Sequence, residues 1–516
     1  MDAASKELVS RKIKSAEELS KILGPRPRKQ KVIMCHGTFD VVHPGHVRHL
    51  LYAKTKAKIL VASLTADEHI KKGDMRPYVP QDLRAINLAA LEMVDYVVVD
   101  SDPTPIRNLD IIKPDYFAKG YEYTAGHVHP KTQEEIDILD SYGGEIIFTP
   151  GDIIYSSSAL IELAQPSIAV EKLITLMEAE NITFKDLRTA ISNMRGIEVH
   201  VVGDTIVDSY TYCSMIGGMT KTPTMSVRFE KKVDYVGGAG IVAKHLSAAG
   251  AKVSFSTILG NDEYQTFVLD DLRKYGVNCL PIIDETRPTT NKNAIVASEY
   301  RLLKVDSVDN RSISNKILNQ LKNQIASTSS QAAIFCDFRH GIFNRETIPE
   351  LTAAIPSTVY RVADSQVASR WGNILEFQGF DLITPNEREA RFALGDQDSV
   401  IRPLALELHK KANCKILILK CGQRGIITYR NHSEDLRAFF VVDSFAERVV
   451  DAVGAGDALL AYATLAQVAT GNDVISAILG NIAAGVECEH DGNWPVTPDH
   501  VLKKIDRLQA LVQYSN

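Results

Sequence analysis

Two histidines stand three residues apart in the stretch HGTFDVVHPGH, directly after an apolar run that predicts a strand. Pro44 and Gly45 lie between His43 and His46 and predict a turn that leads into a helix. A helix N-terminus attracts anions, and imidazole donors beside it could stabilise charge that grows on an α-phosphoryl group. The pattern therefore predicts a site for a nucleoside triphosphate, with both histidines catalytic. The alternative is an incidental pair of histidines in a turn.

A second glycine-rich turn lies near the C-terminus, in DAVGAGDALLAY (451–462). Gly454, Ala455 and Gly456 predict a backbone turn whose N–H groups face one anion, followed by a helix whose positive end adds to the attraction. Asp457 is placed to take a proton from a hydroxyl that attacks a γ-phosphate. The alternative is a plain turn in which Asp457 caps the helix.

Strands and helices alternate on both sides of residue 196, which predicts parallel sheets in two α/β domains. The expected boundaries are an N-terminal helical extension (1–30), a first α/β domain (31–165), a helical linker (166–196) and a larger α/β domain (197–516). The expected strands of the first domain are VIMC, ILVASL, YVVV, YFAKG and EIIFTP, and those of the second include IEVHVVGD, VSFSTIL, AAIFCDF, TVYRVADS, LITPN and ILILKCG.

The composition excludes several classes of protein. The chain has 516 residues and a net charge of −6, which argues against general binding of nucleic acid. No apolar run has the roughly 18 residues of a membrane span, and the charged N-terminus lacks the apolar centre of a signal peptide. Seven scattered cysteines without metal-type spacing predict reduced thiols in a cytoplasm.

The first domain resembles the HxGH nucleotidylyltransferase superfamily over 31–162, through HGTFDVVHPGH, LTADEHIKKGDMRPYVPQDLRAINLAALEMVDYVV and YSSSALI. It is similar to glycerol-phosphate and ethanolamine-phosphate cytidylyltransferases, and closer to the adenylyltransferase domain of the bacterial heptose kinase/adenylyltransferases. The resemblance implies a Rossmann-like fold with catalytic His43, His46, Lys71 and Lys72, a nucleotide cleft lined by Gly37, Thr38, Phe39 and Asp40, substrate contacts from Arg84 and Asp67, and phosphate donors Ser156, Ser157 and Ser158.

The second domain resembles the ribokinase-like carbohydrate kinases over about 197–505, through VVGDTIVDSY, VGGAGIVAKHL, ITPNEREA, LILKCGQRGI and DAVGAGD. The resemblance implies an α/β domain with a small β-lid. Its implied site comprises Asp204, Asp208, Gly237 and Gly238 at the sugar, Asn386 and Glu389 for Mg²⁺ and phosphates, Lys420, Gly422, Gly425 and Asn481 at the nucleotide, and Gly454, Ala455, Gly456 and Asp457 at the transferred phosphoryl group. The stretch FRHGIF offers Arg339 and His340 as substrate contacts, or as a solvated turn.

The heptose kinase/adenylyltransferases again provide the closest family, with three departures. The domains stand in the reverse of the usual order. Ile241 occupies the position of an asparagine that grips sugar hydroxyls, and Ser365-Gln366 replaces Pro-Lys, so that a cation is missing on the substrate side. The two substitutions leave the identity of the sugar undetermined, but they do not affect the expected phosphoryl transfer.

The leading hypothesis is a bifunctional enzyme of nucleotide-sugar synthesis. It would use ATP and Mg²⁺ to phosphorylate a heptose 7-phosphate-like sugar at C1, and would join a sugar 1-phosphate to a nucleotide with release of pyrophosphate. One alternative is a CTP-dependent cytidylyltransferase fused to a kinase for another sugar or polyol. Another is a regulatory or scaffold protein with one inactive site. The expected partners are sugar phosphates, nucleotides and a second copy of the chain, without nucleic acid or membrane.

Overall fold

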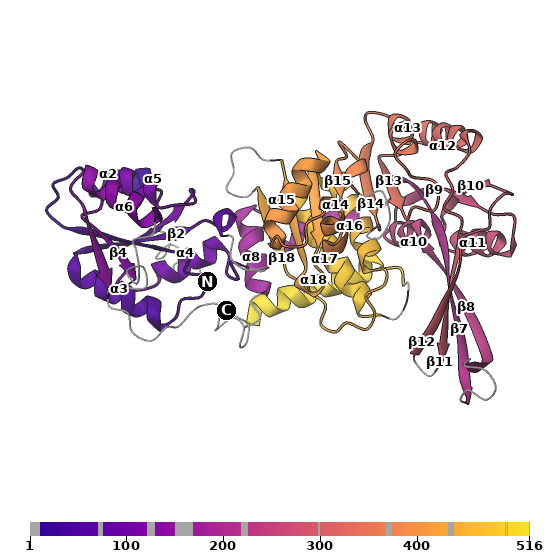
Figure 1. The fold of residues 1–516 in the computed structure, drawn as a ribbon, viewed down its shortest axis with the longest axis horizontal. Coiled ribbons are helices and arrows are strands. Elements are labelled where there is room, and N and C mark those ends of the chain that lie inside the picture. The colour runs from indigo at the N-terminus through magenta and orange to yellow at the C-terminus, as the bar shows by residue number, and fades with distance from the viewer. Residues whose placement is uncertain are drawn as a thin grey trace. The chain divides into compact units, whose positions relative to one another are not determined.

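The computed structural model describes residues 11–70, 76–120, 130–149, 169–217, 225–297, 300–367, 374–431, 438–490, 492 and 494–514. Within those ranges, no helix combines the length and apolar character needed to cross a membrane. The chain divides into two compact units, with Met1–Thr175 in the first, and Leu176–Ser433 and Ala438–Leu511 in the second. The two are described separately (Figure 1).

The first unit is built on a parallel five-stranded sheet in the order β3-β2-β1-β4-β5. The strands are β1 (Val32–Gly37), β2 (Ile59–Thr65), β3 (Tyr96–Asp100), β4 (Tyr116–Gly120) and β5 (Glu145–Thr149). The order reverses between β1 and β4, and ligands of open α/β sheets bind at the carboxyl ends of the strands beside such a point. The stretch with the two histidines follows β1 and therefore lies at this edge.

Both faces of the sheet are covered by helices. Alternate residues of β1 point to opposite sides, so the strand contributes to a core on each face. Ile33 and Cys35 join a core with α3 (Pro44–Lys56) and α4 (Gln81–Ala89). Val32 and Met34 join a second core with α2 (Ala16–Leu23), α5 (Ile106–Ile112) and α6 (Pro130–Ser141). Helix α2 begins with a capping box in which Ser15 and Glu18 satisfy each other's backbone N–H groups.

The second unit contains a nine-stranded sheet in the order β10-β9-β6-β13-β14-β15-β16-β17-β18. The strands are β6 (Glu198–Gly203), β9 (Lys252–Leu259), β10 (Asn278–Ile283), β13 (Ala332–Asp337), β14 (Tyr360–Ser365), β15 (Leu382–Ile383), β16 (Ile416–Lys420), β17 (Ile426–Arg430) and β18 (Phe439–Val442). The pairs are parallel from β10 to β16 and antiparallel from there to β18. The order reverses between β6 and β13, so this edge also favours a ligand site.

Helices accompany the sheet of the second unit. They are α9 (Phe184–Asn193), α10 (Ala239–Ala248), α11 (Glu263–Lys274), α12 (Asn315–Ser327), α13 (Thr347–Ala353), α14 (Glu387–Leu394), α15 (Ile401–Ala412), α16 (Ala455–Thr470), α17 (Asp473–Cys488) and α18 (Pro498–Tyr514), while α8 (Ala169–Ala179) spans the boundary of the units. The mutually packed rings of Phe335, Phe343, Phe377 and Phe380 lie in its largest core cluster. Helix α9, within the expected linker, packs on α16 and α17.

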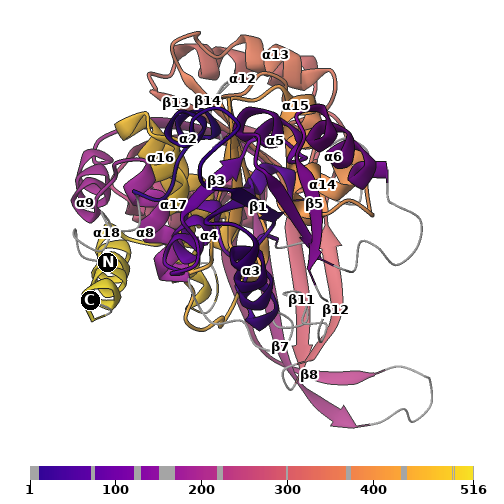
Figure 2. The same ribbon diagram turned by 90° about the vertical axis from the view of Figure 1, so that its left-hand side faces the viewer.

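A separate four-stranded sheet, the lid, extends from the second unit in the order β12-β11-β7-β8 (Figures 1 and 2). Its strands are β7 (Thr205–Gly217), β8 (Ser226–Gly238), β11 (Asn291–Ala297) and β12 (Tyr300–Ser307). The two α/β folds and the lid confirm the fold class expected from the sequence.

Candidate active sites

Asp457 lies in the first turn of α16 with its carboxyl group almost wholly buried. The helix begins at Gly454, whose φ of 87° is a backbone conformation that side chains disfavour. Burial, together with the negative charge of Asp364, raises the pKa of Asp457 to about 7, although Lys420 opposes the shift. A carboxyl group with a pKa near neutrality at a helix N-terminus suits a general base that acts beside a phosphate.

A buried ion pair lies next to this turn. Lys420, the last residue of β16, donates from Nζ to Oδ1 of Asp364 at 2.9 Å. A methyl group added to Gly456 would lie 3.2 Å from the same Nζ, so the ammonium group lies against the glycine-rich turn. Burial disfavours the charged form of Lys420, but Asp364 and Glu389 outweigh that effect and its pKa is raised. Lys420 therefore supplies positive charge where a phosphoryl group would bind.

Asn386 and Glu389 form a reciprocal cap at the start of α14, as the NxxE spacing allows. The Asn386 backbone N–H donates to Oε2 of Glu389 at 2.8 Å, and its side-chain amide donates to Oε1 at 2.6 Å. Burial raises the pKa of Glu389 to about 7. No cluster of three metal-ligating side chains occurs among the described residues. Mg²⁺ commonly binds one or two carboxylates together with substrate phosphates, so the residues fit a metal that Glu389 helps to hold.

The two aspartates expected at the sugar have different surroundings. Asp204, after β6, accepts the backbone N–H groups of Phe338 and His340 through Oδ2, each at 3.1 Å. Asp208, on the lid strand β7, is half-buried, and burial raises its pKa. The charge of Asp208 contributes to the raised pKa of Asp457, so these two carboxyl groups lie within electrostatic reach of each other. Gly237 and Gly238 end β8 beside the start of α10.

Other predicted residues of the second unit make contacts within the protein. Arg339 is buried and pairs with Asp337 and Glu376. Asn481, on α17, donates to the backbone carbonyl of Asp443 at 2.7 Å. Gly422 and Gly425 both have positive φ, and a side chain at Gly425 would clash with the carbonyl oxygen of Val442. Ile241, at the departure from the kinase pattern, is buried within α10.

Gln366, on the loop after β14, contacts the predicted base. The sequence pattern marked this residue only as the replacement of a lysine and did not predict the contact. Its side-chain amide donates to Oδ1 of Asp457 at 3.0 Å, and its backbone N–H donates to the carbonyl oxygen of Asp337. The sequence could have indicated this contact through the position of Gln366, which follows a central strand at the edge of the sheet where ligands bind. Gln366 therefore holds one carboxylate oxygen of Asp457.

In the first unit, His43 and His46 lie at the start of α3 with their rings stacked at a centroid distance of 3.8 Å. Nδ1 of His43 accepts the Gly45 N–H at 3.1 Å, and Nδ1 of His46 accepts the His43 N–H at 3.4 Å. Both rings therefore carry their proton on Nε2, and His46 also makes a hydrogen bond to the backbone of Val41. Burial and the neighbouring His43 lower the pKa of His46 to about 4, so that it stays a neutral donor at pH 7.

Arg84 organises the loop around the predicted nucleotide cleft. Its side chain is completely buried and donates to the backbone carbonyl groups of Thr38, Thr65 and Val79 and to Oδ1 of Asp67. Gly37 ends β1, while Phe39 has a φ of 48° and its ring contacts that of His46. Oδ1 of the buried Asp40 accepts the Val79 N–H at 2.8 Å. Roles of these residues toward a substrate stay predictions.

A polar cluster at the same sheet edge was not foreseen. The ring of His36, on β1, contacts the hydroxyl groups of Ser63 and Thr65 on β2 at 3.0 and 3.3 Å, and lies 3.7 Å from Asp100 on β3. Burial lowers the pKa of His36 to about 4 and raises that of Asp100 to about 6, which favours the uncharged form of each. Lys119, at the end of β4, pairs with Glu135. The sequence could have indicated these polar residues by their position, because they lie at the carboxyl ends of neighbouring strands.

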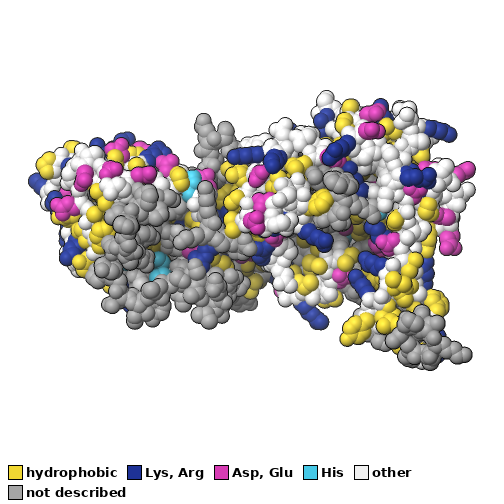
Figure 3. All heavy atoms as spheres, viewed as in Figure 1, with side chains coloured by type: hydrophobic (Ala, Val, Ile, Leu, Met, Phe, Trp, Pro, Cys, Tyr) yellow, Lys and Arg dark blue, Asp and Glu magenta, His cyan; other side chains and the backbone are white. Residues whose placement is uncertain are grey.

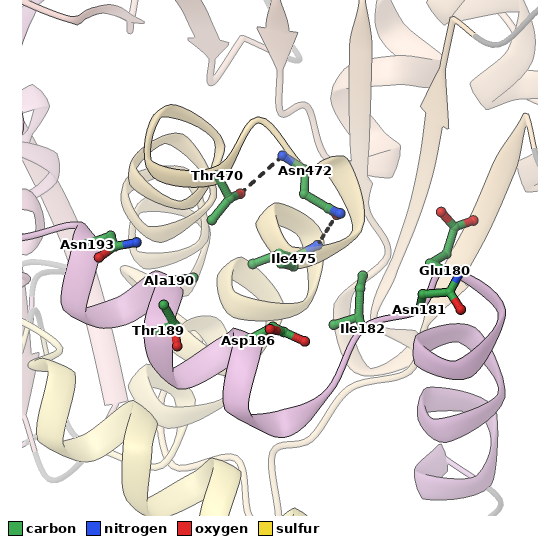
Figure 4. Close-up of a pocket in the computed structure, with 10 residues that line it drawn as sticks. All are labelled: Glu180, Asn181, Ile182, Asp186, Thr189, Ala190, Asn193, Thr470, Asn472 and Ile475. Carbon is green, nitrogen blue, oxygen red and sulfur yellow. Dashed lines mark hydrogen bonds between the residues drawn. The ribbon is translucent and has the colours of Figure 1, made fainter.

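The predicted Lys71, Lys72, Ser156, Ser157 and Ser158 lie outside the described residues. None of the predicted residues lines a cavity of about 300 Å³ between α9 and the turn from α16 to α17 (Figure 4). Its polar lining is explained by helix capping, since Asp186 forms a capping box with Thr183 and Asn472 caps α17. We assign it no chemistry.

Comparisons with known proteins agree with this geometry. Residues 197–498, more than half of the chain, match the family described as pfkB family carbohydrate kinase. The chain belongs to the pfkB family of carbohydrate kinases. Residues 34–162 match the family described as cytidylyltransferase-like, so the chain combines a carbohydrate kinase domain with a nucleotidyltransferase domain.

Similar proteins of known name are bifunctional. The chain is 29% identical over 322 residues to the bifunctional protein HldE of Sulfurimonas denitrificans, in a match that covers 61% of this chain and 65% of that protein. It is 29% identical over 319 residues to HldE of Desulfatibacillum aliphaticivorans, covering 60% and 62%. The chain thus spans less than two thirds of these relatives. Phosphofructokinase-2 of Escherichia coli, at 16% identity and a TM-score of 0.50, covers 61% of this chain and 99% of its own and shares the fold.

The contact between Gln366 and Asp457 predicts that Gln366→Ala lowers the kcat of the kinase about 10-fold, because a hydrogen bond to a charged group is lost. The KM values for ATP and sugar should change little, since Gln366 acts through the base. Steady-state kinetics would show this split. Gln378→Ala is the matched control, because its amide donates to the backbone carbonyls of Leu375 and Lys411, away from Asp457. An unchanged kcat would contradict the prediction.

The contacts of Arg84 predict that Arg84→Met lowers the free energy of unfolding of the first unit by about 3–5 kcal/mol, because Asp67 loses its buried partner. Denaturant unfolding would measure this loss. Arg107→Met is the control, since that guanidinium group pairs with Glu17 at the surface, where ion pairs contribute at most about 1 kcal/mol. Equal losses in the two variants would mean that Arg84 is not an organising residue.

Proposed function

We propose that the chain is a bifunctional enzyme of nucleotide-sugar synthesis. The kinase domain transfers the γ-phosphoryl group of ATP to the C1 hydroxyl of a heptose 7-phosphate-like sugar. The transferase domain joins a sugar 1-phosphate to a nucleoside monophosphate taken from a triphosphate, with release of pyrophosphate. The observation that carries the proposal is that one chain holds both a buried base at a glycine-rich helix start and a pair of Nε2–H histidines at another.

In the kinase step, Asp457 takes the proton of the attacking hydroxyl group. The backbone N–H groups of the turn before α16 and the ammonium group of Lys420 stabilise the charge on the transferred phosphoryl group. Mg²⁺, when bound, neutralises charge on the ATP phosphates, and Glu389 is the residue that would help to hold it. Asp208 and Asp204 orient the sugar.

In the transferase step, the acceptor phosphate itself is the nucleophile. His43 and His46 donate from Nε2 to the α-phosphoryl oxygens as their negative charge grows. A neutral His46 suits this role, because it stabilises charge without giving up its proton. We propose ATP as the nucleotidyl donor, and CTP is the alternative that the match to a cytidylyltransferase-like family favours.

We infer that the protein acts in the cytoplasm as a homodimer that pairs through the lid. The cysteines form no disulfide, which fits a reducing compartment. Large hydrophobic side chains are exposed on the lid strands and just before β8, and Figure 3 shows hydrophobic side chains over this extension at the lower right. They are Met215, Ile216, Met225, Phe229, Tyr300, Leu303 and Val305. Such a patch favours a protein partner.

The two activities should separate by mutation within one chain. Asp457→Asn should abolish formation of a bisphosphate from heptose 7-phosphate and ATP, yet leave formation of a nucleotide sugar from heptose 1-phosphate intact. His43→Ala and His46→Ala should each lower the kcat of nucleotidyl transfer about 10²–10³-fold and spare the kinase, because one donor to the transition state is lost. Product masses measure both reactions, and each activity controls for folding. A wild-type chain that forms neither product would overturn the proposal.

The raised pKa of Asp457 predicts how kinase activity depends on pH. The base acts in its ionised form, so kcat/KM should fall as the pH drops through about 7 and level off above it. The transferase activity of the same chain provides the control, since His46 has a pKa of about 4 and stays neutral over this range. A kinase profile that is flat from pH 5 to 8 would contradict the role of Asp457.

A further inference from the structure

A short turn, the β13 turn (338–341), follows β13 at the edge of the second sheet that favours a ligand site. The sheet order places β13 between β6 and β14, and the three strands are parallel. The backbone N–H groups of Phe338 and His340 both donate to Oδ2 of Asp204, which follows β6, at 3.1 Å each. A buried carboxylate therefore holds the β13 turn to the end of one neighbouring strand.

Arg339, between these two N–H donors, has a left-handed backbone conformation with a φ of 57°. This conformation is strained for a residue with a side chain, and it persists only where the surrounding contacts enforce it. The backbone N–H and Nε of Arg339 donate to the two carboxylate oxygens of Asp337, at 2.8 and 2.9 Å, and a terminal nitrogen atom of its guanidinium group donates to Glu376. Only 9% of the side chain is exposed, so the guanidinium group is used inside the protein.

Asp337 connects Arg339 to the other neighbouring strand, β14. Its Oδ2 atom also accepts the hydroxyl group of Ser365 at 2.8 Å, and its backbone carbonyl oxygen accepts the N–H group of Gln366 at 2.9 Å. The side-chain amide of Gln366 in turn donates to Oδ1 of Asp457. A continuous path of hydrogen bonds therefore leads from Arg339 to the predicted base.

The charge of Arg339 also favours the form of Asp337 that accepts these hydrogen bonds. Burial raises the pKa of Asp337 to about 7, although the positive charge of Arg339 opposes the shift. Without the guanidinium group the pKa would lie higher, and the carboxyl group would be protonated at pH 7. An ionised carboxylate only accepts hydrogen bonds, whereas a protonated one also donates, so its contact with Ser365 would be weakened.

We propose that Arg339 is a positioning residue of the kinase reaction, which acts through Asp337 and the end of β14 to fix the carboxyl group of Asp457. The inference rests on the proposed kinase function and adds to it a residue that touches no substrate. A substrate contact at Arg339 would contribute to the KM for the sugar. A positioning residue contributes to kcat instead, because the orientation of the base matters in the transition state.

The test uses Arg339→Gly, because glycine adopts a φ of 57° without strain and the variant therefore removes the side chain alone. With heptose 7-phosphate, ATP and Mg²⁺, its kcat should fall about 10- to 100-fold, since a small misplacement of a catalytic group has an effect of this size. The KM values for the sugar and for ATP should remain those of wild type. Ser365→Ala removes one hydroxyl group on the same path and should give the same split with a smaller loss. Arg339→Lys keeps the charge and should recover part of the kcat that Arg339→Gly loses.

A double variant tests whether these residues act along one path. Arg339→Gly/Gln366→Ala should lose less kcat than the product of the two single losses, because both changes release the same carboxyl group of Asp457. Arg345→Met is the matched control, since that guanidinium group also pairs with Glu376, at 3.1 Å, but 81% of its side chain is exposed. It should leave kcat and both KM values unchanged, and circular dichroism checks the fold of each variant.

Any of three results would overturn the positioning role while the kinase function stands. They are a raised KM for the sugar with an unchanged kcat in Arg339→Gly, an unchanged kcat in Ser365→Ala, and single losses that multiply in the double variant. If Arg339→Gly does not fold, Ser365→Ala decides the question alone, because it removes a single hydroxyl group. If wild type phosphorylates no sugar, the proposed function fails and the positioning role fails with it.

Discussion

The ion pair between Lys420 and Asp364 is the interaction on which the kinase site depends. Burying an isolated charge is very unfavourable, and here carboxyl groups from β14, α14 and α16 gather around one ammonium group. That group pairs with Asp364 and opposes the upward pKa shifts of Asp457 and Glu389. The same ammonium group lies against the turn before α16, where we propose that the transferred phosphoryl group binds.

The predicted transferase site places neutral rings, and not an ion pair, at the start of a helix. Its histidines accept backbone N–H groups on Nδ1, and burial keeps His46 uncharged. Arg84 donates hydrogen bonds to the surrounding carbonyl groups and to Asp67. These bonds hold the loop that carries Thr38 in place. The difference follows from the nucleophile. A hydroxyl group must lose a proton and needs a base, whereas a phosphate is already ionised and needs only donors for the transition state.

The two faces of the lid sheet carry different kinds of side chain. Because side chains alternate along a strand, one face can carry Asp208, Lys292 and Lys304 while the other carries apolar residues such as Leu303 and Val305. Asp208, on the first of these faces, lies within electrostatic reach of Asp457. The exposed side chains of the apolar face are those through which we propose that two chains pair. A shift of one residue in register would exchange the two faces, so the character of each face depends on the same strand pairing.

The sequence by itself determined the two α/β domains, their strands and the positions of Asp457, His43 and His46, because periodicity and glycine-rich turns are local signals. It did not show that Gln366 holds Asp457, that Arg84 is completely buried, or that His36, Ser63 and Asp100 meet across three strands. These contacts join segments that are far apart in the chain, and their distances depend on strand order and register. Lys420 could be recognised from its motif, but only the tertiary structure placed its ammonium group beside Gly456, because packing and not sequence spacing brings β16 against the start of α16.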